Sequence, residues 1–323
     1  MTRISLQLLA CACAAAGATS AFAQPYPTRL VRIVVGFAPG GSMDVVARIA
    51  ADRLRESLGQ QVIVENRAGA SGSIAADALA KAAPDGHTIM LAGGGTLAIR
   101  QKLELKLPYD AQRDFAPVIQ VANLPLLLVV PTSLPVKSVK ELVTLARARP
   151  GQLNFSSSGV GSTTHLSGEM LKALAKIELT HVPYKGSSQM LPDLVAGQIS
   201  LAFDQITTTQ PYIAAGKLRA LAISTPKRSR LMPALPTIAE AGVPGYEAIS
   251  WNGFVVPAAT PRTIVERIND ETVKLLNTTS TAERLASIGA EPAGGTAEQF
   301  AAFIKAESIR WGRLIDRLGI KPQ

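Results

Sequence analysis

The sequence predicts an α/β protein with two lobes, and three observations support this fold class. Short β-type runs alternate with helical patterns along the chain, which is typical of mixed or mostly parallel sheets flanked by helices. The chain has 323 residues, more than one such sheet usually needs, so two lobes are expected. Residues 123–131 and 246–257 offer two crossings between lobes. We therefore expect a first lobe from residues 24–123 and 252–323, a second lobe from residues 124–251, and a ligand cleft between them.

The N-terminus has the features of a secretory signal peptide. Arg3 precedes an apolar stretch at residues 4–18, and the small-residue triplet at residues 21–23 suggests cleavage after Ala23. The apolar stretch is short and rich in alanine, which disfavours a membrane anchor. Residues 1–23 are thus predicted to direct export to the periplasm.

Cysteine usage narrows the chemistry of the exported protein. Cys11 and Cys13 both lie within the predicted signal, so the mature chain would have no cysteine for disulfides, thiol catalysis or metal binding. Residues 8–11 faintly resemble a lipoprotein processing site, in which Cys11 would carry the lipid. The short apolar segment before Cys11 makes this alternative the weaker one.

The N-terminal part of the mature chain begins with strand and helix patterns in alternation. Apolar runs predict strands at residues 31–36, 61–65, 87–92 and 118–130, the last one interrupted at Pro125. Helical spacing predicts helices at residues 45–58 and 73–82.

The same alternation continues in the middle of the chain. Strands are expected at residues 153–157, 179–184, 198–204 and 218–224, and helices at residues 139–148, 166–174, 188–196 and 211–215.

A glycine-rich loop joins the first predicted strand to the first predicted helix. It reads Phe37-Ala38-Pro39-Gly40-Gly41-Ser42-Met43-Asp44. The first turn of a helix has backbone N–H groups without intrahelical partners, so this arrangement can bind an anion. The glycines allow a close backbone approach, and Ser42 or Asp44 could cap the helix. An ordinary strand–helix connection is the alternative, and the motif alone does not decide between the two.

Further segments in similar positions are candidate ligand contacts, among them the loop at residues 184–188, which also lies between a strand and a helix. Residues 156–164, which include Ser157, Gly161, Ser162 and Thr163, also follow a strand and open a helix. They lack the lysine of a P-loop and the third glycine of a dinucleotide fingerprint, so they favour no nucleotide. Gly93 and Gly94 follow another strand. Asp204 ends a strand, where open α/β sheets usually place ligand contacts, although a capping role would also explain it.

Most signatures of enzymes, metal sites and nucleic-acid binding are missing. The three histidines lack the spacing of metal ligands. Ser162 and His165 could act as nucleophile and base of a secreted hydrolase, but His165 is better explained as a residue of a first helical turn. The net charge of +9 comes from scattered cations with little aromatic interleaving, which argues against nucleic acid as a partner.

Taken in order, several short motifs resemble those of the Bug receptors, the extracytoplasmic solute-binding proteins of tripartite tricarboxylate transporters. The similarity covers essentially the whole mature chain. The matching segments are residues 37–42 with Asp44, 66–70, 107–110, 114–115, 161–162, 165–166, 181–186, 193–194, 197–198, 203–204 and 216–221.

The resemblance implies a two-lobed periplasmic binding fold, type II-like, that closes on a small carboxylated solute without a cofactor, a metal or catalysis. By carry-over, residues 37–42 and Asp44 would form one half of the clamp. Ser157, Gly161, Ser162 and Thr163 would form the other, with Gly93, Gly94 and Asp204 lining the cleft. Asp44 is expected to shape the loop, because its charge would repel an anionic ligand.

The expected partners are inner-membrane transporter subunits, and the receptor is expected to be a monomer. A receptor coupled to a signalling kinase is an alternative. Met43 stands where a threonine or serine is usual in the family, which leaves the identity of the solute open.

Overall fold

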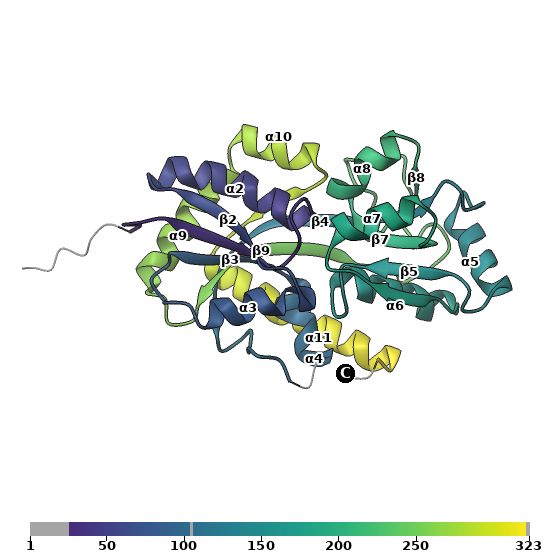
Figure 1. Ribbon diagram of the computed structural model, residues 1–323, viewed down its shortest axis with the longest axis horizontal. Coiled ribbons are helices and arrows are strands. Elements are labelled where there is room, and N and C mark those ends of the chain that lie inside the picture. The colour runs from purple at the N-terminus through teal and green to yellow at the C-terminus, as the bar shows by residue number, and fades with distance from the viewer. Residues whose placement is uncertain (1–25, 104–105, 321–323) are drawn as a thin grey trace, which may run out of the picture.

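The computed structural model describes residues 26–103 and 106–320. The predicted signal peptide, with Cys11 and the cleavage site, lies outside these residues. Two groups of strands and their covering helices lie side by side along the long axis of the molecule, as Figure 1 shows. Within the described part of the chain, no helix is both long and apolar enough to cross a membrane.

The first half of the molecule is built on a six-stranded mixed sheet. In spatial order, its strands are β2 (Val62–Asn66), β1 (Val31–Val35), β3 (Thr88–Gly93), β9 (Ile249–Pro257), β4 (Phe115–Pro131) and β10 (Glu291–Gly294). The pairs of β1 with β2 and with β3 are parallel, whereas β9 runs antiparallel to both β3 and β4. The parallel strands all end at the same edge, so the loops that follow them meet there.

The second half contains a five-stranded sheet that shares β4 with the first. Its spatial order is β8 (Leu218–Ile223), β4, β7 (Leu201–Gln205), β5 (Asn154–Ser157) and β6 (Thr180–Pro183). Pairing of β4 with β9 ends at Pro125, and pairing with β7 begins at Leu126. Pro125, expected to interrupt the apolar run, instead lies within a continuous strand at the point where that strand passes from one sheet to the other. A proline is tolerated there because the ladder changes partners.

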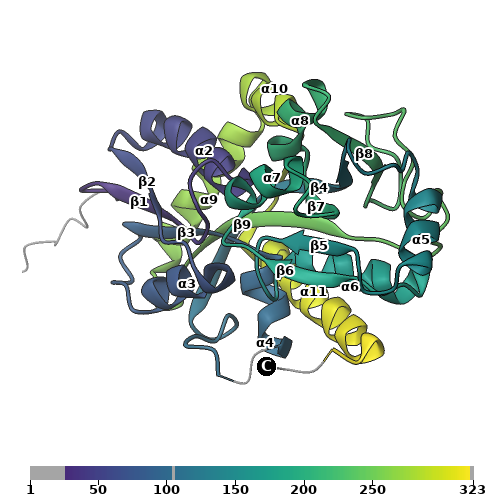
Figure 2. The same ribbon diagram turned by 45° about the vertical axis from the view of Figure 1, so that its right-hand side comes forward.

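Helices cover both faces of each sheet, as the turned view in Figure 2 also shows. Around the first sheet lie α2 (Ser42–Leu58), α3 (Ser73–Ala80), α4 (Arg100–Leu103), α9 (Arg262–Leu276), α10 (Thr279–Ser287) and α11 (Ala297–Leu318), with the short turns η1 (Ala70–Gly72) and η2 (Gly95–Ile99). Around the second lie α5 (Val139–Ala148), α6 (Thr163–Ala175), α7 (Ser187–Val195) and α8 (Ile206–Ala214). Apolar side chains of strands and helices form the core between these layers.

Helices α2, α6 and α8 begin three or more residues earlier than their sequence patterns predict, with α6 starting at Thr163 rather than at residue 166. Helix α2 starts at Ser42 rather than at residue 45, so the glycine loop runs directly into its first turn. Helix α8 starts at Ile206 and contains Pro211, which had been expected to open the helix. In its first turns, the hydroxyl of Thr209 donates to the Gln205 carbonyl, and that of Thr208 donates to Asp204. These polar residues hide the helical period in the sequence.

Candidate functional site

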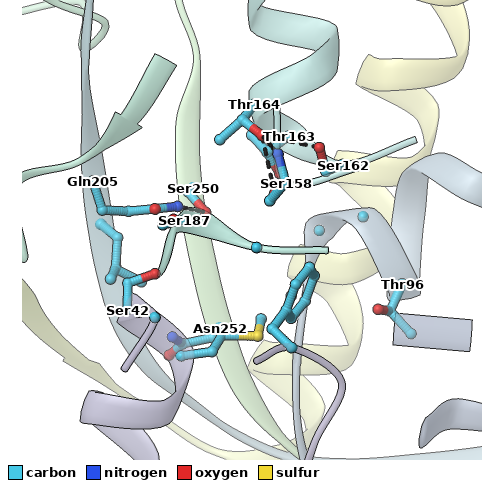
Figure 3. A pocket seen from close by; sticks show the side chains of 18 residues that line it. Ser42, Thr96, Ser158, Ser162, Thr163, Thr164, Ser187, Gln205, Ser250 and Asn252 are labelled. Atoms are coloured by element: carbon cyan, nitrogen blue, oxygen red, sulfur yellow. Dashed lines mark hydrogen bonds between the residues drawn. The ribbon is translucent and has the colours of Figure 1, made fainter. Parts of the chain in front are cut away.

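A narrow cavity of about 50 Å³ lies where the two sheets meet. Its lining residues come from both halves of the molecule, and none of them carries a charged side chain. A single water needs roughly 10–15 Å³ measured in this way, so the cavity is larger than a water site. In Figure 3, Ser158, Ser162, Thr163 and Thr164 gather on one side, and Ser187, Gln205 and Ser250 on another.

The loop after β1 contributes the first wall. Phe37, Gly41 and Ser42 line the cavity, with Gly41 as the N-cap of α2. No side chain caps this helix by a hydrogen bond. The N–H groups of its first turn have no intrahelical partners, so they are available to an acceptor in the cavity. This is the geometry that the sequence motif suggests.

Asp44 supports this loop from behind. Its carboxylate accepts hydrogen bonds from the Gly40 N–H at 3.0 Å, from Arg48 at 2.9 and 3.0 Å, and from the Asn66 amide at 3.0 Å. Burial raises the pKa of Asp44, but these hydrogen bonds outweigh burial and hold the pKa below its ordinary value. Asp44 is 3% exposed and does not line the cavity. Its contacts therefore shape the loop.

The loop after β5 forms the opposite wall. Ser162 caps α6, because its hydroxyl oxygen accepts a hydrogen bond from the His165 N–H at 3.2 Å. The same hydroxyl donates a hydrogen bond to the Gly159 carbonyl at 2.7 Å. Ser162 and Thr163 line the cavity. Gly161 lies behind them with φ +74°, a left-handed conformation that favours glycine. This loop thus presents a second helix N-terminus to the same space.

The contacts of Ser162 and His165 do not form a nucleophile–base pair. His165 Nδ1 accepts the Gly161 N–H at 3.3 Å, and its Nε2 lies 3.9 Å from Glu169. The Ser162 hydroxyl bonds backbone groups and Thr164, so the imidazole has no contact through which to take its proton. The hydrolase interpretation is therefore not supported by the geometry, and Ser162 serves as a helix cap.

A pair of buried imidazoles underlies this wall. The rings of His165 and His181 stack at 4.2 Å, and His181 Nε2 lies 2.6 Å from the Ser157 hydroxyl. Burial, followed by the charge of Lys172, lowers the pKa of His165 to about 4. Burial and then His165 lower the pKa of His181 to about 3. Both rings are thus neutral at physiological pH, and Ser157 bonds one of them instead of lining the cavity.

Helix α7 brings a third N-terminus to the cavity. Gly186, its N-cap, and Ser187 line the cavity, and no side chain caps this helix. The Ser187 hydroxyl donates to Asp204 at 2.7 Å, and Thr208 donates to the same carboxylate at 2.7 Å. Asp204 is fully buried, and burial raises its pKa to about 6 despite these donors. Asp204 therefore orients Ser187 from outside the cavity.

The loop after β3 closes the remaining side. Gly93, Gly94 and Gly95 line the cavity, and Gly95 begins the π-helical turn η2. A Cβ at Gly94 would lie 3.3 Å from the Thr163 hydroxyl, so glycine permits the two halves to approach closely here. Thr96 follows in the same wall. The cavity is thus surrounded by the beginnings of four helical segments.

The structure brings together half of the residues that the sequence suggested for ligand binding. Those that line the cavity are Phe37, Gly41, Ser42, Gly93, Gly94, Ser162 and Thr163. Those that lie outside the lining are Ala38, Pro39, Gly40, Asp44, Ser157, Gly161 and Asp204. The latter group shapes the loops through backbone conformation or hydrogen bonds. Whether each residue touches the ligand stays a prediction.

Several lining residues were missed by sequence reasoning. They include Ser158, Thr164, Ser187, Gln205, Ser250 and Asn252. Ser158, Thr164 and Ser187 lie in loops that had been identified as candidates, so a hydroxyl count there could have found them. Ser250 and Asn252 lie on β9, where only the register shows which side chains face the cavity. They have no local signal in the sequence.

This arrangement suits a small anion. Helix N-termini attract negative charge through their free N–H groups and the helix dipole. Hydroxyls and amides supply further donors, and no anionic side chain lines the cavity to oppose the ligand. In the described part of the chain, no cluster of histidine, aspartate or glutamate forms a metal site.

Comparisons with known proteins agree with this description. The family described as "Tripartite tricarboxylate transporter family receptor" matches residues 46–320. The structure of Rpa4515 from R. palustris with adipate has a TM-score of 0.90 at 43% sequence identity, and the match covers 92% of this chain and all of that one. MatC from Rhodopseudomonas palustris with malate has a TM-score of 0.86 at 34% sequence identity, and the match covers 90% of this chain and all of that one. The periplasmic binding protein BugD has a TM-score of 0.88 at 33% sequence identity, and the match covers 92% of this chain and all of that one. These likenesses confirm the predicted two-lobed fold class.

Proposed function

The chain belongs to the tripartite tricarboxylate transporter receptor family, and on this premise we propose that it is a periplasmic receptor for a small carboxylate. It would deliver the bound solute to the membrane subunits of a tripartite transporter. Membership of a receptor family confirms the expectation of a binding protein rather than an enzyme. The predicted signal peptide supports the periplasmic location.

The observation that carries this proposal is the convergence of helix N-termini on an uncharged cavity. Each N-terminus stabilises a nearby negative charge by roughly 0.3–1 kcal/mol, and by up to ~2 kcal/mol where partly buried. Helices α2, α6 and α7 together can hold a carboxylate without a salt bridge. Rpa4515 with adipate and MatC with malate, two similar structures, hold dicarboxylates, which supports a carboxylate as the ligand here.

Capture would occur by closure of two lobes around the solute. The proposed lobes are residues 24–123 with 252–323, and residues 124–251. Strand β4 changes sheets between Pro125 and Leu126, and β9 leaves its pairing with β4 at Ile249. These two strands are therefore the connections about which the lobes would move. A ligand that contacts both walls stabilises the closed arrangement and shifts the population toward it.

A thermal unfolding experiment on the mature protein tests the proposal. The protein is unfolded and refolded to remove any co-purified ligand, then heated with adipate, malate or other small carboxylates, and with the neutral diamides of the same acids. A ligand at 100 times its dissociation constant stabilises by about 2.7 kcal/mol, a readily measured shift. We expect a shift with one or more acids and none with the diamides. A panel of carboxylates without any shift would contradict the proposal.

A further inference from the structure

Asn252 is a buried polar residue whose side chain has no partner within the protein. It lies on β9, is 0% exposed, and lines the cavity. Among the described residues, neither its Oδ1 nor its Nδ2 has a hydrogen-bond partner, and it is the one lining residue with such atoms. Leaving a buried polar group unsatisfied costs about 1–3 kcal/mol, so nearly all such groups find partners. The side chain therefore requires an explanation.

The register of the sheet shows which way this side chain points. Ser250 and Asn252 alternate along β9 with Trp251, so they share one face of the strand. Trp251 faces away, because its indole contacts the rings of Phe300 and Phe303 and donates to Glu307. Ser250 lines the cavity as Asn252 does. The amide of Asn252 thus belongs to the floor of the ligand site.

Met43 covers the same part of the floor. Gly93 is the register partner of Asn252 across the antiparallel pair of β3 and β9, so the two residues share a face. The Cε atom of Met43 lies 2.6 Å from where a Cβ of Gly93 would stand. The Met43 methyl therefore fills the space beside Asn252. A methionine side chain is unbranched and flexible, so it can move aside when a ligand enters.

An amide offers a donor and an acceptor side by side. The carboxylate of a simple acid accepts from Nδ2 but leaves Oδ1 unpaired, since a carboxylate has no proton to donate. A hydroxyl on the carbon next to a carboxylate changes this, because the hydroxyl donates to Oδ1 while the carboxylate accepts from Nδ2. An ammonium could also donate to Oδ1. It would be buried without a counter-ion, because no lining residue is charged and Asp204 already accepts from Ser187 and Thr208.

We propose that Asn252 determines specificity by binding a 2-hydroxy carboxylate through both atoms of its amide, with Met43 as the movable cover. This inference rests on the proposed function, because it assumes that the cavity holds a carboxylate. It narrows the ligand to 2-hydroxy carboxylates. It also assigns the discrimination between these and acids without the hydroxyl to Asn252, a residue outside the glycine loops.

Isothermal titration with matched acids tests the inference on the mature protein. The pairs are malate with succinate and 2-hydroxyadipate with adipate, which differ by one hydroxyl, and aspartate replaces the hydroxyl of malate by an ammonium. In the wild type, we expect the hydroxy acid of the pair that fits to bind at least about tenfold more tightly than its parent acid. Aspartate should bind more weakly than malate. Equal binding within both pairs, or tighter binding of aspartate, would overturn the inference.

The variant Asn252→Leu removes both polar atoms at similar volume. We expect the affinity ratio within the pair to fall to within about threefold of unity. Thr260→Val is the matched control, since Thr260 is another buried residue with an unpartnered hydroxyl but lies outside the cavity lining. It should leave the ratio unchanged. Persistence of the ratio in Asn252→Leu would show that a buried water, not the solute, satisfies the amide.

The two proposals fail in different ways. Binding of succinate or adipate without preference for the hydroxy acids would refute the role of Asn252 and leave the receptor function standing. A wild type that binds no carboxylate would refute both. If Asn252→Leu does not fold, the ratio in the wild type and in Asn252→Ala decides.

Discussion

The hydroxyl of Ser71 donates a hydrogen bond of 2.7 Å to the backbone carbonyl of Val160, joining the two halves of the molecule beside the ligand cavity. Arg100 donates to the same carbonyl at 3.2 Å. Ser71 and Arg100 belong to the first half, whereas Val160 lies in the loop between β5 and α6. Ser71 has φ +47°, a left-handed conformation that a non-glycine residue rarely adopts. In this conformation, the Ser71 side chain points toward the other half of the molecule.

Ser71→Ala is expected to speed the release of ligand. In the proposed closure, this hydrogen bond forms only when the halves meet, so its loss destabilises the closed arrangement by about 1 kcal/mol. We expect a dissociation rate roughly fivefold higher, measured by stopped-flow fluorescence. Ser200→Ala is the control, because the Ser200 hydroxyl accepts from the Asn154 N–H within one half. A release rate unchanged in Ser71→Ala would argue against a role of this contact in closure.

Gly41→Asp should abolish binding while preserving the fold. Gly41 has φ −75° and ψ 166°, a conformation open to any residue, and a Cβ there would lie 3.4 Å from the nearest atom. Aspartate is a favourable N-cap, so α2 should be stabilised by roughly a few tenths of a kcal/mol relative to glycine. Its carboxylate would, however, occupy the N–H groups that the ligand needs and repel the ligand's charge. We expect at least about a hundredfold loss of affinity by titration.

The matched control is Gly41→Asn, which has nearly the same shape and also caps helices but carries no charge. It should weaken binding less than Gly41→Asp does. An aspartate variant that binds the carboxylate as well as the wild type would show that the first loop is not part of the site.

Asp44→Asn is expected to lower both stability and affinity. The substitution removes the charge that Arg48 pairs with and turns an acceptor of the Gly40 and Asn66 N–H groups into a partial donor. Losing one partner of a buried charged network costs about 1–3 kcal/mol. Urea unfolding should show this loss, and titration should show weaker binding because the loop is no longer held. Asp52→Asn, at an exposed ion pair with Arg284, should cost less than about 1 kcal/mol. Tighter anion binding in Asp44→Asn would instead show that Asp44 faces the ligand.

Sequence reasoning located the site's loops better than its side chains. The glycine loop before α2 and the serine–glycine loop before α6 could be found because each sits between a strand pattern and a helix pattern, and the backbone chemistry follows from that position. Asp204 was also noticed at a strand end. Its role could not be predicted, because the donors Ser187 and Thr208 come from α7 and α8 and meet it only in the folded protein.

The floor of the cavity lay beyond prediction for a different reason. Asn252 faces the ligand site because β9 pairs with β3 and β4 in one particular register, and a shift of one residue would turn it to the other face. Likewise, Pro125 was predicted to interrupt the strand at residues 118–130, because a proline in a strand usually ends the pairing of that strand with its neighbour. The change of partner strand at that residue depends on sheets built from distant segments.

The buried pair His165 and His181 should make the protein less stable as the pH falls from about 6.5. Burial lowers the pKa of both rings in the folded state, to about 4 and about 3, whereas an unfolded histidine titrates near 6.5. Between these values the unfolded chain binds more protons, so the free energy of unfolding decreases as the pH falls. The greatest possible slope is roughly 1.4 kcal/mol per pH unit for each histidine. Asp204, whose pKa is raised to about 6, acts in the opposite sense below that pH and offsets part of the slope.

Urea unfolding at pH 7, 6 and 5 measures this slope, and His165→Gln should make it shallower. Ligand affinity should stay nearly constant over the same range, because a pKa of about 4 keeps Nδ1 of His165 unprotonated and able to accept the Gly161 N–H, the bond that shapes the wall before α6. His87→Gln is the control, since His87 lies outside this pair and outside the cavity lining. A stability that stays constant from pH 7 to 5, with the slope of His165→Gln equal to that of the wild type, would show that the rings are already charged or accessible in the folded protein. The wall of the site would then be independent of the pair beneath it.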